Sequence, residues 1–562
     1  MLSTGPDNMA SYTPSDEKTH FDHVEVTKSP GSGPTVDTID LDHLADASDY
    51  THAVRKATER EHALSFREAA RAYPWAFFWS IAISFTIIMD GYDTYLLSQF
   101  YAYPSFAKKY GEFNPAQNDY NVPANTMVML ANLNMFGSCI GLFGMSLVTE
   151  RFGHRKVIMM GLAMLVATNF LTFFAPNIKW LTAGVCLSGI PQGLFGILGS
   201  AYASEVAPLA LRGFLTSFVN ICWVIGQFVA GGLLAGLVNI PSEWSFRIPF
   251  GLQWVWCVPV FFLTLWAPDS PWWCVRKGNM AGAERSVKKL SPKSTHSETR
   301  ELLAMYQHTT AMEMADRVGT TVLDCFKGVD RRRTEIACMV LAAQPLSGEL
   351  FAYGSTYFFR QAGLSADNTY KLNFGSTAVA FVGTVFSWIL AIWFGRRTLI
   401  IAGFVLMGLE LLIIGILHYF NSAQSVVWTQ AALTVLWLGT YSATLGPQSF
   451  GLAAEVSATK LRAPTIALAR LWYTICCIIG VSFQPYLINA TALNLKGRTG
   501  FVWFGFCVLT LIWCIFRLPE TKGLTYAELD ILFERRTPAW KFKSTKVDVI
   551  EETTRDAGSD SA

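Results

Sequence analysis

The sequence predicts an all-α membrane protein with twelve transmembrane helices in two halves of six. Three observations predict it: the composition, the length of the apolar segments, and a set of landmarks repeated between the halves. Of 562 residues, 51% are hydrophobic and 15% are charged, against roughly 25% charged residues in an ordinary soluble domain. Apolar runs of about 20 residues span a bilayer as helices, so we expect repeated crossings of a membrane.

The apolar segments form two sets of six. A window of about 19 residues places the first set near 75–100, 124–148, 157–175, 180–203, 213–239 and 248–267. The second set falls near 335–359, 373–393, 399–419, 427–452, 463–487 and 500–517. We therefore expect five parts: a largely disordered N-terminal tail, a first helical half, a charged central loop, a second helical half and a C-terminal tail, over 1–74, 75–267, 268–334, 335–517 and 518–562.

The orientation follows from basic residues in short loops, because such loops stay on the cytoplasmic side. Arg151, Arg155 and Lys156 follow the second apolar segment, and Arg396 and Arg397 follow the eighth. An even number of spans places both termini and the central loop on that same side. No charged and apolar leader typical of a signal peptide precedes the first segment, so we expect this segment to insert the chain.

Composition also excludes several classes of protein. The net charge is +2, and this near balance gives no support to a nucleic-acid partner. The 11 cysteines lie mostly inside apolar runs and show no metal-ligand spacing, so we expect packing residues and no metal site. The charged segment 274–334 contains no phosphate-binding loop and no catalytic triad. We therefore expect neither an enzyme nor a bound cofactor.

Three landmarks occur in the same order in both halves. Each half has a basic loop after its second segment, a Glu and an Arg seven residues apart after its fourth, and a proline-acid motif after its sixth. They are Arg151–Lys156, Glu205 with Arg212, and Pro268–Pro271 in the first half, and Phe394–Arg397, Glu455 with Arg462, and Pro519–Gly523 in the second. Two parallel six-helix repeats are typical of the major facilitator architecture, which binds substrate near the midplane between its halves.

These landmarks resemble the signatures of the sugar porter family of the major facilitator superfamily, over residues 75–535. Within that family, the chain is similar to fungal α-glucoside and maltose proton symporters at Asp90–Thr94, Phe100–Pro104, Ala201–Val206, Asn220–Gln227, Ser355–Phe359 and Thr465–Arg470. The resemblance implies import of a sugar together with protons. The chain departs from the pattern at Ser138, where an acid is usual, at Gln192, where an aromatic is usual, and at Asp90, which replaces Glu.

Ionisable side chains inside a membrane are costly and usually serve a function. Asp90 and Asp93 are three residues apart, hence on one helix face, and two close carboxylates disfavour double ionisation. We expect them to carry the proton, with Arg470, and the resemblance matches Asp93 and Arg470 to charged positions of the symporters. Permanent pairing with Arg470 for structure is the alternative. We interpret Glu410, in the ninth segment, as structural.

A sugar needs hydrogen-bonding groups for its hydroxyls and an apolar or aromatic face for its ring. The candidate ligands are the polar and aromatic side chains at membrane depth: Gln192, Asn220, Gln227, Gln344, Glu349, Tyr353 and Tyr441. The resemblance places Gln227 and Gln344 at sugar-contact positions of the family. An amide in a membrane helix can instead bond a neighbouring helix.

The charged landmarks are candidates for a gate. Ion pairs at the inner face can hold the two halves together when the cavity opens outward. The candidate gating residues are Arg151, Arg155, Glu205, Arg212, Arg397, Glu455 and Arg462. The alternative is that these arginines only anchor the topology.

Together these observations predict a monomeric plasma-membrane transporter that imports an α-linked disaccharide such as maltose, sucrose or trehalose with protons. A facilitator or exporter of another polar metabolite is the alternative, favoured by the departures at Ser138 and Gln192. A sugar sensor that does not transport is a third possibility. Asn489 begins a glycosylation motif, Asn-Ala-Thr, which lies so close to the membrane edge that we expect no glycan there.

Overall fold

The computed structural model describes residues 47–115, 118–317, 321–420, 424–458, 460–489, 492–524 and 526–545. The chain divides into two compact units, Met1–Ala47 and Ser48–Ala562. All but one of the described residues belong to the second unit. The expected disorder of residues 1–46 lies outside the described residues.

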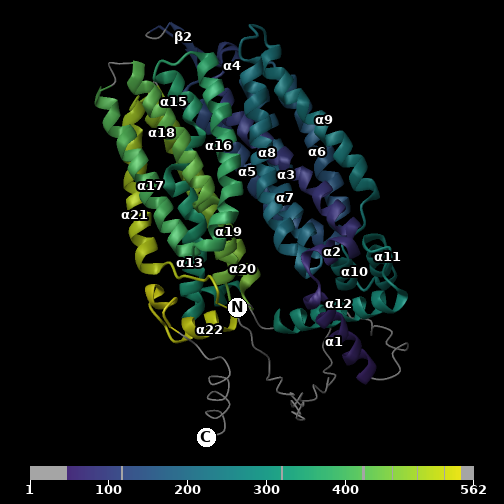
Figure 1. Ribbon diagram of the computed structural model, residues 1–562. Coiled ribbons are helices and arrows are strands. Elements are labelled where there is room, and N and C mark those ends of the chain that lie inside the picture. The colour runs from purple at the N-terminus through teal and green to yellow at the C-terminus, as the bar shows by residue number, and fades with distance from the viewer. Residues whose placement is uncertain are drawn as a thin grey trace, which may run out of the picture. The chain divides into compact units, whose positions relative to one another are not determined.

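The first half contains six long helices at the expected positions. They are α3 (Pro74–Phe100), α5 (Ala124–Phe152), α6 (His154–Phe173), α7 (Ile178–Val206), α8 (Leu209–Leu237) and α9 (Trp244–Trp266). Each coincides with an apolar segment of the sequence to within a few residues. Figure 1 shows these helices as one bundle, beside a second bundle formed by the later part of the chain.

The second half contains the other six long helical segments. They are α13 (Gly328–Gln344) continued by η2 (Pro345–Glu349), α14 (Leu350–Tyr353) and α15 (Ser355–Gln361); α16 (Ala366–Trp393); α17 (Arg396–Leu417), which η3 (His418–Phe420) follows; α18 (Gln424–Ala443) continued by α19 (Leu445–Val456); α20 (Arg462–Ile488); and α21 (Thr499–Arg517), which η4 (Lys496–Arg498) precedes. The seventh and tenth segments are therefore interrupted within the apolar runs 335–359 and 427–452.

Proline causes both breaks. A proline in a helix has no N–H to donate, and its ring clashes with the carbonyl group four residues earlier. Pro447 lies four residues after Ala443, and α18 ends at Ala443. In the seventh segment Pro345 begins a π turn, and Gly348 follows with φ +100°, a conformation that residues other than glycine rarely adopt.

Ten helices among the described residues are long and apolar enough to cross a membrane. The two remaining helices of the six-helix halves, α8 and α18, are outside this set. Helix α8 contains a shorter apolar stretch, Ile221–Leu237, and α18 has glutamine, serine and threonine side chains between its apolar residues. With these two, the helices make the expected twelve in two halves of six, so the fold prediction is confirmed.

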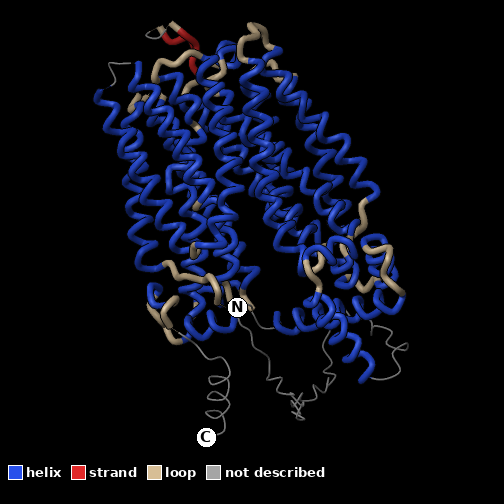
Figure 2. The backbone as a smooth tube through the Cα atoms, in the orientation of Figure 1, coloured by secondary structure: helices blue, strands red, loops and turns tan. Residues whose placement is uncertain are grey.

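Short elements lie at the two ends of the helices. At one end, here named the hairpin end, β1 (Glu112–Asn114) and β2 (Asp119–Asn121) form an antiparallel pair after α4 (Pro104–Tyr110). Figure 2 shows the strands in red at the top. At the other end, here named the connector end, lie α1 (Ala47–Ala63), α2 (Phe66–Ala72), α10 (Pro271–Arg276), α11 (Met280–Leu290), α12 (His296–Arg317), η1 (Val322–Phe326), α22 (Tyr526–Glu534) and η5 (Ala539–Lys541).

Part of the N-terminal tail is ordered and packs on the central loop. Helix α1 packs on α12 through the ion pairs Lys56–Glu301 and Arg60–Glu298, each with an N–O distance of 2.7 Å. Ser65 caps α2 in a reciprocal arrangement with Glu68. The expected disorder of residues 1–74 therefore does not extend to 47–72, because these residues find partners on the connector helices.

Glycines allow the helices of the first half to touch through their backbones. In α5 and α7, a methyl group added at Gly141 would lie 1.9 Å from the carbonyl oxygen of Ile190. In α8 and α3, a methyl group at Gly226 would lie 2.1 Å from the carbonyl oxygen of Ile88. Small residues permit such close approach between membrane helices, where packing contributes more than the hydrophobic effect.

The contact of Gly226 in α8 with Ile88 in α3 predicts the effect of adding one methyl group at Gly226. Gly226→Ala should destabilise the protein by about 1–3 kcal/mol, because a backbone oxygen cannot move away without shifting α3 against α8. Gly236→Ala, in the same helix, should not, since nothing lies within 4 Å of the added carbon. Thermal unfolding of the two purified variants measures the difference. Equal melting temperatures would show that the close contact carries no stability.

Candidate functional site

A buried acid lies inside the first half, surrounded by amides. Asp93 in α3 accepts hydrogen bonds from the side chain of Gln192 in α7 and from that of Gln253 in α9. Asn134 in α5 donates to Gln192 Oε1 at 3.0 Å. Four helices therefore converge on one carboxylate, and its hydrogen-bond partners are neutral.

A small cavity adjoins this acid within the first half. Its lining residues come from α3, α5, α6, α7 and α9: Asp93, Thr94, Leu97, Asn134, Asn169, Thr172, Val185, Ser188, Gln192 and Phe250. Most of them carry a hydroxyl, amide or carboxyl group. Polar groups in such a space can hold water next to the acid.

The second acid of α3, Asp90, is 4% exposed. Its carboxylate interacts electrostatically with Asp93 and with Arg470 of the second half. Arg470 in α20 lies with its guanidinium 4.9 Å from the ring centre of Tyr473 and 5.5 Å from that of Phe450. In the described part of the structure, Arg470 is therefore stacked on aromatic rings, and no ion pair of 4 Å or less joins it to either aspartate.

A second polar cluster lies where the second half faces the first. The hydroxyl of Tyr441 in α18 donates to Gln344 Oε1 at 3.0 Å and adjoins the Glu349 carboxylate. The side chain of Tyr353 in α14 lies close to that of Gln227 in α8 of the first half. The predicted ligands Gln227, Gln344, Glu349, Tyr353 and Tyr441 are thus brought into one cluster.

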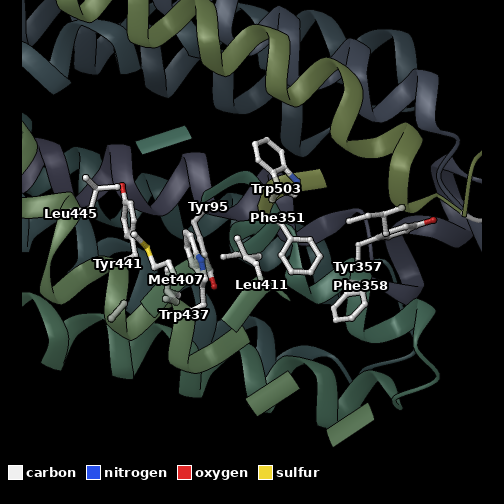
Figure 3. Packing of buried hydrophobic residues seen from close by; sticks show 14 of the residues in the cluster. Tyr95, Phe351, Tyr357, Phe358, Met407, Leu411, Trp437, Tyr441, Leu445 and Trp503 are labelled. Atoms are coloured by element: carbon white, nitrogen blue, oxygen red, sulfur yellow. The ribbon is translucent and has the colours of Figure 1, made fainter. Parts of the chain in front are cut away.

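Aromatic rings surround the same cluster. The rings of Trp437 and Tyr441 stack with 5.5 Å between centroids, and the edge of Tyr95 meets the ring of Tyr353 at 6.3 Å. Figure 3 shows Tyr95, Trp437 and Tyr441 near one another among the buried apolar residues. The Tyr95 hydroxyl donates to Asn373 Oδ1 in α16 at 2.6 Å.

Several polar atoms in this cluster have no hydrogen-bond partner among the described residues, although they are buried. They are Gln344 Nε2, Glu349 Oε2, Asn373 Nδ2 and Trp437 Nε1. An unpaired buried polar group costs about 1–3 kcal/mol. Donors and an acceptor beside an aromatic stack are the groups that a polyhydroxylated ring would pair with.

Hydrogen bonds between the halves gather at the hairpin end. Gln99 in α3 is fully buried, donates to the carbonyl oxygen of Tyr353 at 2.9 Å and accepts from Thr356. Tyr370 donates to the carbonyl oxygen of Gln99 at 2.6 Å. Further pairs that join the halves are Asn132 with Ser482, Asn239 with Asp367, Arg360 with Asp119, Tyr486 with Asn125, and Asn489 with Val122.

The candidate gating residues make local contacts in the described conformation. Glu205 bonds Arg276 at 2.6 Å and accepts from Ser270, while Glu455 bonds Arg396 at 2.6 Å. Arg155 and Arg397 donate to carbonyl oxygens of α9 and α21, and Arg151 lies over the ring of Phe152. None of these contacts joins the two six-helix halves. The predicted inner gate concerns the state whose cavity opens outward, and it stays a prediction.

In this conformation the side-chain amide of Gln192 is hydrogen-bonded to Asp93 and Asn134, and its role in binding sugar stays a prediction. The side chains of Asn220 and Arg212 lie outside the described part of the structure. Asn489 is fully buried and donates to the carbonyl oxygen of Val122 at 2.9 Å, which leaves no room for a glycan.

Sequence reasoning missed Asn134 and Gln253 beside Asp93, and Tyr95 and Asn373 beside Tyr353. All four are polar or amphipathic side chains within apolar helices, the same signal that singled out Gln192. What the sequence could not provide was the helix face on which each of them lies.

Two six-helix halves with polar side chains buried between them define a membrane transporter. The comparisons with known proteins agree. The family described as "Sugar (and other) transporter" matches residues 79–533, and the chain belongs to this family. It is therefore a multi-pass membrane transporter and not an enzyme.

Relatives and solved structures extend this result. The chain is 34% identical over 542 residues to a general alpha-glucoside permease of Saccharomyces cerevisiae, covering 95% of this chain and 87% of the permease. It is 34% identical over 539 residues to a maltose permease of the same yeast, with the same coverage. The fold matches the xylose transporter XylE from E. coli in a partially occluded inward open conformation, with TM-score 0.66, 17% identity, and coverage of 80% of this chain and 100% of XylE.

The contacts of Gln99 predict that this residue holds the hairpin end closed. Gln99→Leu leaves the Thr356 hydroxyl and the Tyr353 carbonyl unpaired in the closed arrangement, at a cost of about 1–3 kcal/mol. Hydrogen–deuterium exchange should therefore rise in α14 and α15. Gln430→Leu is the matched control, since Gln430 is also buried but donates within its own half, to Ile414. Similar exchange in α14 and α15 of both variants would contradict the prediction.

Proposed function

We propose that the protein imports an α-linked glucoside, such as maltose, sucrose or trehalose, together with protons by alternating access. The observation that carries this proposal is the identity of 34% over 95% of the chain to permeases for α-glucosides and maltose. We further propose that it acts as a monomer in the plasma membrane. Both termini then lie in the cytoplasm, as the basic loops indicate.

The sugar site of this proposal is the cluster between the halves. Gln344, Glu349 and Tyr441 from the second half would meet the hydroxyls of one glucose unit, with the stacked ring of Trp437 against its apolar face. Gln227 from the first half would complete the site. The unpaired atoms of Gln344, Glu349 and Trp437 support this proposal, because a bound sugar would give each of them a partner.

The proton carrier of this proposal is Asp93, with Asp90 as its neighbour. A protonated carboxyl group donates a hydrogen bond, so one of the amides that now donate to Asp93 must turn its oxygen toward the acid. Gln253 Oε1 is buried without a partner among the described residues. Rotation of the Gln253 amide would satisfy the new donor, so proton binding would alter the contact between α3 and α9.

Alternating access then requires that the contacts between the halves at the hairpin end break and that new contacts form between the halves at the connector end. With the connector end in the cytoplasm, the hydrogen bonds around Gln99 close the outer side in the described conformation. In the outward-open state, we propose, Arg151, Arg155, Arg397 and their acidic partners meet across the connector end. Rocking of one half against the other is the general mechanism of this fold.

A facilitator or exporter of another polar metabolite remains the second candidate. Ser138 favours it, because the resembled symporters carry an acid at this position of α5. Without that acid, the first half has one fewer carboxyl group to bind protons.

Uptake by transporter-deficient yeast expressing the protein distinguishes the two functions. Labelled maltose, sucrose, trehalose and glucose are offered with and without a protonophore. Accumulation of a disaccharide that collapses with the protonophore supports the proposal. Equilibration without accumulation, unaffected by the protonophore, identifies a facilitator.

Asp93→Asn should abolish accumulation of sugar against a gradient while some downhill exchange continues. The amide keeps hydrogen-bonding capacity near Gln192 and Gln253 but binds no proton in this pH range. Glu410→Gln is the matched control: Glu410 is also buried in a membrane helix, but its partner is Thr440 of the second half, at 3.1 Å. If Asp93→Asn still concentrated sugar with unchanged pH dependence, Asp93 would not be the carrier.

Gln227→Ala and Gln344→Ala should each raise the apparent KM for the transported sugar by about five- to a hundredfold, since each leaves one group unpaired in a closed site. The two effects should not add, because both residues act on one bound ligand. Gln430→Ala serves as the control for loss of a buried amide. A KM within about twofold of the parent for either variant, at equal surface expression, would place the site elsewhere.

A further inference from the structure

A basic pocket lies at the connector end of the second half, apart from the site between the halves. Six residues line it: Gly328, Val329, Arg332, Arg517, Phe533 and Arg536. They come from the start of α13, the end of α21 and the segment around α22. Three are arginines and none is acidic.

The charges around this pocket do not balance. Arg517 binds Glu335 through both carboxylate oxygens, with Nε at 3.0 Å from Oε1. Arg332 lies close enough to Arg517 for the two charges to repel. The Nη1 atom of Arg332 donates to the carbonyl oxygen of Thr537 at 2.8 Å. The Nε atom of Arg332 is buried and has no partner among the described residues. Three guanidinium groups thus line a pocket that has no acidic side chain among its lining residues.

The start of α13 adds further donors to the same pocket. Lys327 precedes the helix and provides no side-chain cap. Gly328 and Val329, the first two residues of α13, line the pocket. The first N–H groups of a helix have no partner within the helix and attract anions.

Arg536 is held in an unfavourable backbone conformation. Its φ is +52°, a value at the end of a helix where glycine is usual. Helix α22 ends at Glu534, and the Thr537 N–H closes the turn on the carbonyl oxygen of Leu532 at 3.1 Å. A glycine would adopt this turn at lower cost, so the turn itself does not call for an arginine.

We propose that this pocket binds a phosphate group, held by Arg332, Arg517 and Arg536 together with the first N–H groups of α13. Guanidinium groups match the oxygens of phosphate with paired hydrogen bonds. A phosphate also carries enough negative charge to balance several arginines at once, which one carboxylate does not. The group can belong to the headgroup of an anionic lipid or to a soluble phosphate.

The neighbouring surface resembles that of proteins at a membrane interface. Trp540 is 52% exposed, and the exposed Lys541 follows it. Tryptophan beside lysine is common at the level of lipid headgroups. Both sources of phosphate are therefore tested separately.

The test uses the full-length protein purified in neutral detergent. Its melting temperature is measured with increasing inorganic phosphate, and again with micelles containing phosphatidic acid or, for comparison, phosphatidylcholine. The pocket variant is Arg536→Gly, which removes one guanidinium while favouring the observed turn. Lys543→Gly removes one positive charge from the same segment outside the pocket and is the matched control.

We expect a rise in melting temperature with phosphatidic acid or with inorganic phosphate. Arg536→Gly should raise the ligand concentration at half-effect by about tenfold, the loss expected for one charge-assisted hydrogen bond, without lowering the melting temperature in the absence of anion. Lys543→Gly should keep the affinity of the parent. Stabilisation by the lipid alone identifies a headgroup site, and stabilisation by both ligands identifies a general phosphate site.

Two results would overturn the proposal. Stabilisation by neither ligand would show that the pocket holds no phosphate. Equal losses of affinity in Arg536→Gly and Lys543→Gly would show that the whole basic surface, rather than the pocket, attracts the anion.

Discussion

Close backbone contact between helices is the constraint on which the first half depends. Gly141 and Gly193 bring α5 against α7, and Gly91 and Gly226 bring α3 against α8, so that carbonyl oxygens occupy the space a side chain would need. Helices packed this closely move as one body, since any rotation would bring atoms into collision. Change between conformations must then take place between the halves.

The two polar clusters follow from this division into rigid halves. Asp93 lies within one half, and its amide partners come from α7 and α9 of the same half. The cluster of Gln344, Glu349 and Tyr441 lies at the boundary, where Gln227 reaches it from the other half. A group inside a half keeps the same neighbouring helices while the halves move, whereas a group at the boundary gains and loses partners.

The ion pairs at the connector end fit the same division. Glu205 and Glu455 bind arginines of their own halves in the described conformation, while the hydrogen bonds around Gln99 join the halves at the opposite end. Each carboxylate therefore has a nearby arginine as its partner in this conformation and can form an ion pair with another arginine when the halves move. Charged pairs tolerate such exchange because their partners at this end also have access to water.

The sequence by itself determined the number, approximate bounds and grouping of the helices, because an apolar run of sufficient length has few alternatives in a membrane. It also determined which polar side chains lie at membrane depth, and hence Asp90, Asp93, Gln344 and Glu349 as candidates. Only the tertiary structure decided their partners. The commitment of Gln192 to Asp93 and the pairing of Glu205 with Arg276 depend on which helix faces meet. Sequence periodicity does not specify those faces in helices that are apolar on all sides.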